Sequence, residues 1–279
     1  MSKSLLALLL VAVAAVCAPP GAMSSAVADE LRLGGTGSAL GLLQRLGEAY
    51  ATLRRGDSVT VLPSLGSAGG IAAVRDGAID IAVSGRALTG AERQSGLRDA
   101  PLLRSPLVLA TSRRDPPGLR LADLPQLYER PEAVWSDGVP LRIILRSPSE
   151  TSVTYLASLV PGLAAAIDAA RTRRYIPVAA TDQDNFALAR ATPGSLTLAL
   201  LVQLKTEGDD LSAVAIDGVA PSLEALADGR YQPAMTLSIV AATQRREPAV
   251  RFLAFLRSPE AAAIIRAAGG SAFDLPVEF

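Results

Sequence analysis

Three short clusters of serine, threonine and glycine carry the clearest site chemistry in the chain. They are 34–38 (GGTGS), 65–70 (LGSAGG) and 146–152 (RSPSETS). Each follows an expected strand and precedes an expected helix, where backbone N–H groups have no partner within the helix and the dipole is positive. Small hydroxyl residues let an anion approach these groups and add donors of their own. The pattern predicts that the three clusters converge on one anion site.

Missing residue types exclude several kinds of catalysis. The chain has no histidine, and its one cysteine is Cys17. A Ser-His-Asp triad and an ordinary zinc site are therefore excluded. The only lysine after Lys3 is Lys205, in a polar stretch far from the serine clusters, which disfavours a serine–lysine enzyme. We expect no catalytic residue and no cofactor. A carboxylate-only magnesium or calcium site stays open, although no EF-hand loop is present.

The first 28 residues have the pattern of a signal peptide. Lys3 gives a positive start, 5–16 is apolar but too short to span a bilayer, and 26–28 (AVA) is a small-x-small cleavage pattern. We expect the mature chain to begin at Asp29 and to be exported to the periplasm. Lipid attachment at Cys17 is disfavoured because Val16, rather than a small residue, precedes it.

Composition limits the remaining classes. Cleavage after Ala28 leaves 251 residues with 26 basic and 27 acidic side chains, so the net charge is −1. That balance and the low aromatic content argue against a nucleic-acid partner. No stretch after the leader approaches 18 consecutive apolar residues, so no membrane span is expected. A monomer is the default expectation.

Hydrophobic patterns predict the strands and helices that carry the three clusters. Strand patterns alternate with helical ones, which predicts an α/β fold with mixed, mostly parallel sheets flanked by helices. Ligands in such folds gather at the carboxyl ends of strands, where the clusters lie. Thr89 and Glu92 form an expected capping box. The expected strands are 31–33, 59–63, 79–83, 107–111, 141–145, 178–180, 195–201 and 211–216, with 231–241 returning to the first half; the expected helices are 40–53, 70–76, 121–124, 152–160, 164–171, 248–256 and 259–268.

The order of elements predicts two lobes. We expect lobe 1 to contain 29–112 and 232–279, and lobe 2 to contain 113–231. The chain then crosses between the lobes twice, and two crossing segments form a hinge that lets the lobes close on a ligand.

Several motifs together resemble the phosphate-binding proteins of ABC transporters. Residues 36–38, 66–71 (GSAGGI), 80–86 (DIAVSGR) and the later Arg-Ser-x-Ser-x-Thr segment occur in that family's order. The resemblance covers roughly 31–268 and implies a two-lobed type II periplasmic-binding fold. It also implies a buried phosphate that is delivered to an ABC transporter permease. The anion ligands that it implies are Thr36, Gly37, Ser67, Ser84, Arg146, Ser149 and Thr151.

Three positions depart from the family's pattern. Glu150 stands where the family has glycine, and a carboxylate beside an anion is unfavourable unless it points away or accepts a proton. Gly85 stands where many members have an aspartate or a second serine, and such an aspartate accepts the hydrogen of a protonated phosphate. Arg146 precedes Ser149 by three residues, one fewer than is typical. These departures leave other oxyanions open: sulfate, molybdate, tungstate or a phosphonate.

Each candidate residue also has a structural interpretation. Thr36 and Ser38 could cap the following helix instead of binding a ligand. Glu150 could be the proton acceptor that Gly85 cannot be, or a carboxylate favoured by a helix dipole. Arg86 is expected to be solvated or in a salt bridge between the lobes. The remaining expectations are turn positions for Asp182 and Asp184 and packing for Trp135 and Tyr231.

At the level of function, the leading expectation is a non-enzymatic receptor for phosphate or a similar tetrahedral oxyanion. A sensor or scaffold that keeps the fold without transport is the alternative from another class.

Overall fold

The computed structural model describes residues 30–54, 56–277 and 279. The expected signal peptide, with Cys17, therefore lies outside the described residues. In chain order the elements are β1 (Glu30–Gly35), η1 (Gly37–Ala39), α1 (Leu40–Leu53), β2 (Ser58–Val61), α2 (Gly66–Arg75), β3 (Ile81–Ser84), α3 (Gly90–Gln94), β4 (Leu97–Thr111), η2 (Leu121–Asp123), α4 (Leu124–Glu129), β5 (Arg142–Ile143), β6 (Leu145–Arg146), α5 (Thr151–Leu159), α6 (Leu163–Arg171), β7 (Val178–Ala179), α7 (Asp182–Ala191), β8 (Ser195–Leu200), α8 (Leu201–Glu207), β9 (Ser212–Ala213), α9 (Leu223–Ala227), β10 (Ala234–Ala242), α10 (Glu247–Leu256), α11 (Pro259–Ala267) and β11 (Ser271–Ala272).

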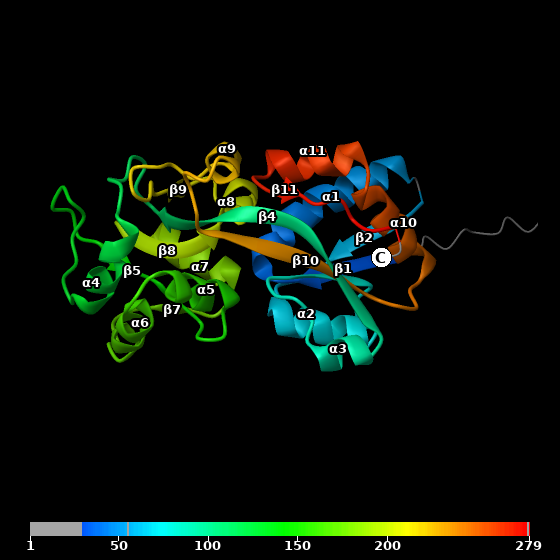
Figure 1. Ribbon diagram of the computed structural model, residues 1–279, viewed down its shortest axis with the longest axis horizontal. Coiled ribbons are helices and arrows are strands. Elements are labelled where there is room, and N and C mark those ends of the chain that lie inside the picture. The colour runs from blue at the N-terminus through cyan, green and yellow to red at the C-terminus, as the bar shows by residue number, and fades with distance from the viewer. Residues whose placement is uncertain (1–29, 55, 278) are drawn as a thin grey trace, which may run out of the picture.

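Two long strands, β4 and β10, run through the middle of the molecule (Figure 1). They pair with each other antiparallel from Leu97 to Pro106 of β4. From Leu107 to Ala110, β4 pairs with β8 instead. One strand thus serves two halves of the fold, and the change of partner falls between Pro106 and Leu107. The predicted limits of the lobes at 112/113 and 231/232 stay predictions, and the names lobe 1 and lobe 2 are used with those limits.

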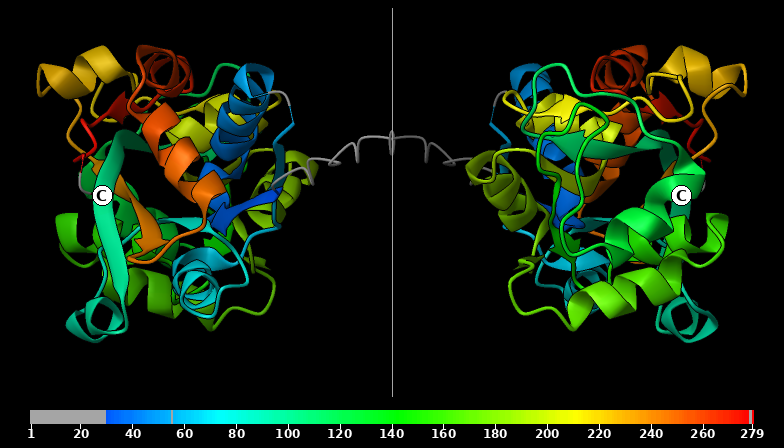
Figure 2. Two further views of the ribbon diagram at one scale, coloured as in Figure 1. Left: turned by 90° about the vertical axis from the view of Figure 1, so that its right-hand side faces the viewer. Right: turned by 90° about the vertical axis from the view of Figure 1, so that its left-hand side faces the viewer.

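Lobe 1 is a sheet covered on both faces. Its strands lie in the order β2-β1-β3-β10-β4, with parallel pairs among the first three and antiparallel pairs at β10. Helices α1, α10 and α11 lie on one side of this sheet, and α2 and α3 on the other (Figures 1 and 2). Tyr50, Phe252 and Phe255 contact one another within the first layer, with ring centroids 5.3–5.9 Å apart. Strands β1 and β3 end beside each other, so the residues that follow them meet at one edge.

Lobe 2 is built around β8, which pairs in parallel with β5, and the separate parallel pair β6-β7. Trp135 and Tyr231 are buried in the core, as predicted. The Trp135 indole N–H donates to the carbonyl of Gly194 at 3.2 Å, and the Tyr231 hydroxyl donates to that of Leu107 at 2.7 Å. Because β6 and β7 run side by side in parallel, the starts of α5 and α7 that follow them lie close together.

Most of the expected elements are confirmed, including the capping box at the start of α3. Glu92 N–H donates to Thr89 Oγ1 at 3.2 Å, and Thr89 N–H donates to Glu92 Oε2 at 2.7 Å. The strand expected over 107–111 was too short, since β4 begins at Leu97. Two prolines, at 101 and 106, interrupt the strand pattern there. The strand expected over 211–216 was too long, because only Ser212 and Ala213 pair with β4.

No helix among the described residues is long and apolar enough to cross a membrane. In the same part of the chain, no three acidic or cysteine side chains are grouped so that they could hold a metal ion.

Candidate functional site

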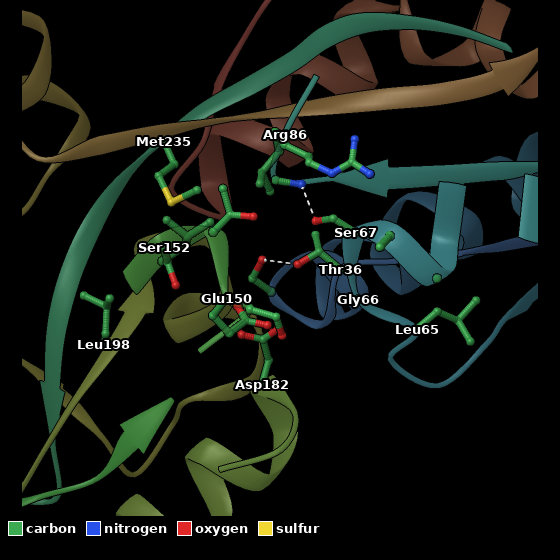
Figure 3. A pocket seen from close by; sticks show the side chains of 18 of the residues that line it. Thr36, Leu65, Gly66, Ser67, Arg86, Glu150, Ser152, Asp182, Leu198 and Met235 are labelled. Carbon is green, nitrogen blue, oxygen red and sulfur yellow. Dashed lines mark hydrogen bonds between the residues drawn. The ribbon is translucent and has the colours of Figure 1, made fainter. Parts of the chain in front are cut away.

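A pocket of about 240 Å³ lies between the two lobes and joins the three predicted clusters (Figure 3). Lobe 1 lines it with residues from 36–38, the start of α2, the end of β3 and β10. Lobe 2 lines it with the start of α5, the first residue of α7 and β8. The lining residues are Thr36, Ser38, Leu65, Gly66, Ser67, Ala68, Gly69, Gly85, Arg86, Ser149, Glu150, Thr151, Ser152, Asp182, Leu198, Ala199, Leu200, Met235 and Leu237.

Thr36 and Ser38 reach the pocket from the turn after β1. Their hydroxyl oxygens lie 3.1 Å apart, and neither side chain makes a capping hydrogen bond to η1 or α1. Gly35 makes the turn possible, because its φ is +117° and a Cβ there would lie 2.1 Å from the carbonyl oxygen of Val83. Thr36 N–H then donates to that same carbonyl at 2.8 Å. This turn directs two hydroxyls at the pocket, and the capping interpretation is not observed.

The start of α2 forms the second part of the lobe 1 wall. Gly66 to Gly69 all line the pocket, and the N–H groups of Gly66, Ser67 and Ala68 have no partner within the helix. Ser67 Oγ accepts a hydrogen bond from Gly85 N–H at 2.9 Å. Because its oxygen is used as an acceptor, the Ser67 hydroxyl hydrogen is left to be donated elsewhere. Figure 3 shows Ser67 and Thr36 on the same side of the pocket.

The start of α5 forms the lobe 2 wall. Ser149, Glu150, Thr151 and Ser152 line the pocket, and Glu150 is the N-cap residue of the helix. The Glu150 side chain makes no capping hydrogen bond; its Oε2 lies 3.3 Å from an Arg146 Nη2. Ser149 Oγ lies 2.9 Å from Ser147 Oγ. A carboxylate therefore faces the pocket beside three hydroxyls.

Arg146 lies behind this wall and not in the pocket lining. It is only 3 % exposed. Its Nη2 donates to Asp182 Oδ1 at 2.7 Å, and its Nη1 donates to the carbonyl of Thr181 at 3.0 Å. The guanidinium that was predicted to grip the anion is thus held between Asp182 and Glu150. The positive charge of Arg146 is therefore already paired with two carboxylates, whether or not a ligand is bound.

Asp182 was predicted as a turn residue, and this prediction was wrong. It is the first residue of α7, it is 7 % exposed and it lines the pocket. Burial raises the pKa of Asp182 to about 6; the charges of Glu150 and Glu207 also raise it, while Arg146 and the Ser38 backbone lower it. The strand end expected at 178–180 is a fourth instance of the cluster pattern. Thr181 caps the helix that follows it, and its Oγ1 accepts from Asp184 N–H at 3.0 Å. Asp184 is thereby a capping-box residue and not a pocket residue.

Three other predicted positions lie at the edge of the site or outside it. Ser84 is fully buried, and its hydroxyl donates to the carbonyl of Arg86 at 2.7 Å. Gly37 offers its carbonyl to Gln183 Nε2 at 3.0 Å, a contact between lobes. Arg86 lines the pocket, but its guanidinium pairs with Glu92 at 2.7 Å and holds the pKa of Glu92 at about 2. Arg86 is thus in an ion pair, but within lobe 1 and not between the lobes.

Part of the pocket wall is apolar, and the motifs gave no indication of it. Leu198, Leu237 and Met235 come from β8 and β10 and face the same space. A larger hollow of about 720 Å³ lies elsewhere on lobe 2, beside Tyr175 and Val134. It contains none of the predicted clusters, so the pocket between the lobes is the candidate site.

Several solved structures are similar to this chain over most of its length. Among solved structures, a protein from Clostridium perfringens assigned as a phosphate ABC transporter substrate-binding protein, with bound phosphate, has a TM-score of 0.73 at 18% identity; the match covers 88% of this chain and 100% of that one. An ABC-type phosphate transport receptor from Vibrio cholerae has a TM-score of 0.57 at 20% identity, covering 89% and 100%. A protein from Planctomyces limnophilus assigned to phosphate binding has a TM-score of 0.54 at 15% identity, covering 90% and 95%.

At such identities these structures establish the fold alone, the type II periplasmic-binding fold. No curated protein matches the sequence. The model of the PBP superfamily domain, however, matches residues 20–260. The chain therefore belongs to the PBP superfamily, a family of solute-binding proteins and not of enzymes.

Proposed function

We propose that the protein captures phosphate or a similar tetrahedral oxyanion in the pocket between its lobes and delivers it to an ABC transporter permease. The protein would work outside the cytoplasm, as a monomer, after removal of residues 1–28. The observation that carries the proposal is the meeting of three hydroxyl-rich clusters at one pocket. Thr36 and Ser38, the start of α2 and the start of α5 all line it.

The pocket's donors suit an anion stripped of water. Helix starts provide N–H groups whose partners lie outside the helix, and the hydroxyls of Ser67 and Thr151 add donors beside them. Fixed donors in a partly enclosed space need no reorganisation when the ligand arrives. Hydrogen bonds to a charged group contribute about 1.5–3 kcal/mol each, against about 1 kcal/mol for neutral pairs.

Other oxyanions compete as ligands for the same pocket. Gly85 offers no carboxylate to accept a hydrogen from a protonated phosphate, which keeps sulfate, molybdate and tungstate in the test panel. A sensor or scaffold without a transport role would use the same pocket, or none. A transport receptor must bind an anion and a permease must depend on it. A sensor or scaffold need meet neither condition.

Thermal unfolding with a panel of anions tests the proposal. The chain from Asp29 to Phe279 is unfolded, dialysed and refolded to remove bound ligand, then heated with phosphate, arsenate, sulfate, molybdate or tungstate at equal ionic strength. A ligand at 100 times its Kd stabilises by about 2.7 kcal/mol. For a chain of this size we expect a rise in Tm of about 5–11 °C with phosphate and arsenate. No rise with any anion of the panel would refute the proposal.

A further inference from the structure

Two carboxylates share one guanidinium on the lobe 2 wall. Arg146 Nη2 lies 2.7 Å from Asp182 Oδ1 and 3.3 Å from Glu150 Oε2. The side chains of Arg146 and Asp182 are 2% and 9% exposed, and that of Glu150 is 24% exposed. With both carboxylates ionised, this group carries a net charge of −1 toward a pocket whose other walls donate hydrogen bonds. Like charges in a poorly solvated site oppose each other strongly, so an anion would be repelled.

Asp182 is the carboxylate better placed to lose its charge. It is the more buried of the two, and its Oδ2 lies against lobe 1, where a Cβ on Gly37 would be 2.6 Å away. The charged groups that face it are Arg146 from β6, Glu150 from the start of α5 and Glu207 from α8. From lobe 1, η1 (GSA) offers the Ser38 backbone and no charged side chain. One cation therefore faces three carboxylates, Asp182 included.

We propose that Asp182 takes up one proton from solution when the anion binds and donates it to the anion as a hydrogen bond. This inference rests on the anion-binding function proposed above. No covalent bond to the ligand forms: the proton moves from water to a carboxylate oxygen, and the O–H then points at an anion oxygen. A carboxylic acid kept neutral by its surroundings can act as a donor in this way. Uptake turns a repelling charge into a partner for the ligand.

The proposal fixes the sign of the pH dependence. In the free protein the pKa of Asp182 is raised to about 6. Above that pH, Asp182 must gain a proton for the anion to bind, so the affinity falls by up to about tenfold per pH unit. Below pH 6 the carboxyl is already protonated, and this contribution to the pH dependence disappears.

Calorimetric titration of phosphate from pH 5.0 to 8.5 tests the assignment, using three variants. Asp182→Asn supplies a neutral N–H donor at every pH and keeps an oxygen for Arg146. We expect it to bind phosphate like the wild type at pH 5.0 and up to about 100-fold tighter at pH 8.0, by the linkage above. Glu150→Gln removes an equal charge and keeps a pH-dependent profile, moved to lower pH because the charge of Glu150 raises the pKa of Asp182. Asp184→Asn, on the same helix and outside the pocket, changes nothing. Because phosphate itself titrates identically in every titration, the difference between variants isolates the protein.

Infrared difference spectroscopy on the wild type gives a second readout that does not depend on a variant folding. Adding phosphate at pH 8.0 is expected to produce the carbonyl band of a protonated carboxylic acid. A wild-type pH profile in Asp182→Asn, a flattened profile in Glu150→Gln instead, or no carbonyl band would each overturn the assignment to Asp182. Those results leave phosphate binding itself in place. Absence of phosphate binding by the wild type throughout pH 5.0–8.5 would overturn the proposed function as well.

Discussion

The two walls of the pocket present different chemistry to the same space. The lobe 1 wall, from Thr36, Ser38 and the start of α2, offers hydroxyls and backbone N–H groups. The lobe 2 wall adds Glu150 and Asp182 to its hydroxyls, with Arg146 buried between them. The lobe 1 wall therefore keeps the same charge between pH 5.0 and 8.5, where its charged lining residue Arg86 stays paired with Glu92, whereas the charge of the lobe 2 wall depends on protonation. An anion that bridges the walls must be bound by both of them. Substitutions in the lobe 1 wall should therefore lower the affinity equally at each pH, whereas substitutions in the lobe 2 wall should change its pH dependence.

The largest effect is expected on the lobe 2 wall from Arg146→Met. The change leaves two carboxylates without their cation, and breaking a buried ion pair this way costs about 3–5 kcal/mol. We expect the free energy of unfolding to fall by this amount at pH 7.5 and by less at pH 5.0, because the raised pKa of Asp182, about 6, makes its carboxyl neutral at the lower pH.

Urea unfolding at the two pH values measures this difference. Arg120→Met is the matched control, since Arg120 pairs with Asp123 on the surface and its side chain is 74% exposed. We expect the control to have almost no effect at either pH. An equal loss for Arg146→Met at pH 5.0 and pH 7.5 would show that the carboxylates behind the pocket do not titrate as described.

The next effect concerns the approach of the walls. In Gly37→Ala, the new Cβ would lie 2.6 Å from Asp182 Oδ2 and 2.8 Å from Gln183 Oε1, both on lobe 2. We expect phosphate affinity to fall at least about tenfold, which is 1.4 kcal/mol, because the lobes cannot close to the same distance. The free energy of unfolding without ligand should change far less. Titration beside Gly90→Ala, where a Cβ meets nothing within 4 Å, checks this expectation, and equal affinities would contradict it.

An effect no larger than this is expected on the lobe 1 wall from Ser67→Ala. The change removes one hydroxyl donor to a charged ligand, worth about 1.5 kcal/mol or roughly a tenfold loss of phosphate affinity. The loss should be the same at pH 5.5 and pH 8.0, since the lobe 1 wall does not titrate. Ser158→Ala, on an exposed turn of α5, serves as the control. A loss of phosphate affinity that grows with pH would contradict the prediction that the lobe 1 wall does not titrate.

Arg86→Met should have the smallest effect. Although Arg86 lines the pocket, both of its Nη atoms bond to Glu92, at 2.8 and 2.7 Å. We expect phosphate affinity to change less than about twofold, since this partly exposed pair balances its own charge and contributes little beyond its two partners. A tenfold loss in the same titration would mean that the guanidinium turns from Glu92 to the ligand.

Sequence patterns predicted the frame of the site well, for a definite physical reason. A strand that ends in Gly-Gly-Thr-Gly-Ser and leads into a helix leaves few arrangements, so the turn between β1 and α1 was identifiable. The helix expected to begin at Gly70 begins at Gly66 instead, inside the second cluster. The partners of side chains were harder to predict. Arg146 pairs with Asp182, which is 36 residues away, and no local pattern encodes that contact. Leu198 and Met235 reach the pocket through the tertiary arrangement of β8 and β10.

The same limit explains Asp182. Its place after Thr181, at the end of a strand, is typical of a turn residue, which is how the sequence was interpreted. Only the packing of η1 against α7 withdraws it from water and aims it at the pocket. Local chemistry thus predicted where helices begin, and the assembly of the lobes decided which of their first residues face the ligand.

A crystal structure of the protein grown with arsenate tests the central claim most directly, because anomalous scattering from arsenic locates the anion without ambiguity. We predict one strong peak in the pocket between the lobes, within hydrogen-bond distance of the Ser67 hydroxyl on one wall and of the start of α5 on the other. An arsenic peak elsewhere with this pocket free of arsenic, or none in a fully soaked crystal, would contradict the account.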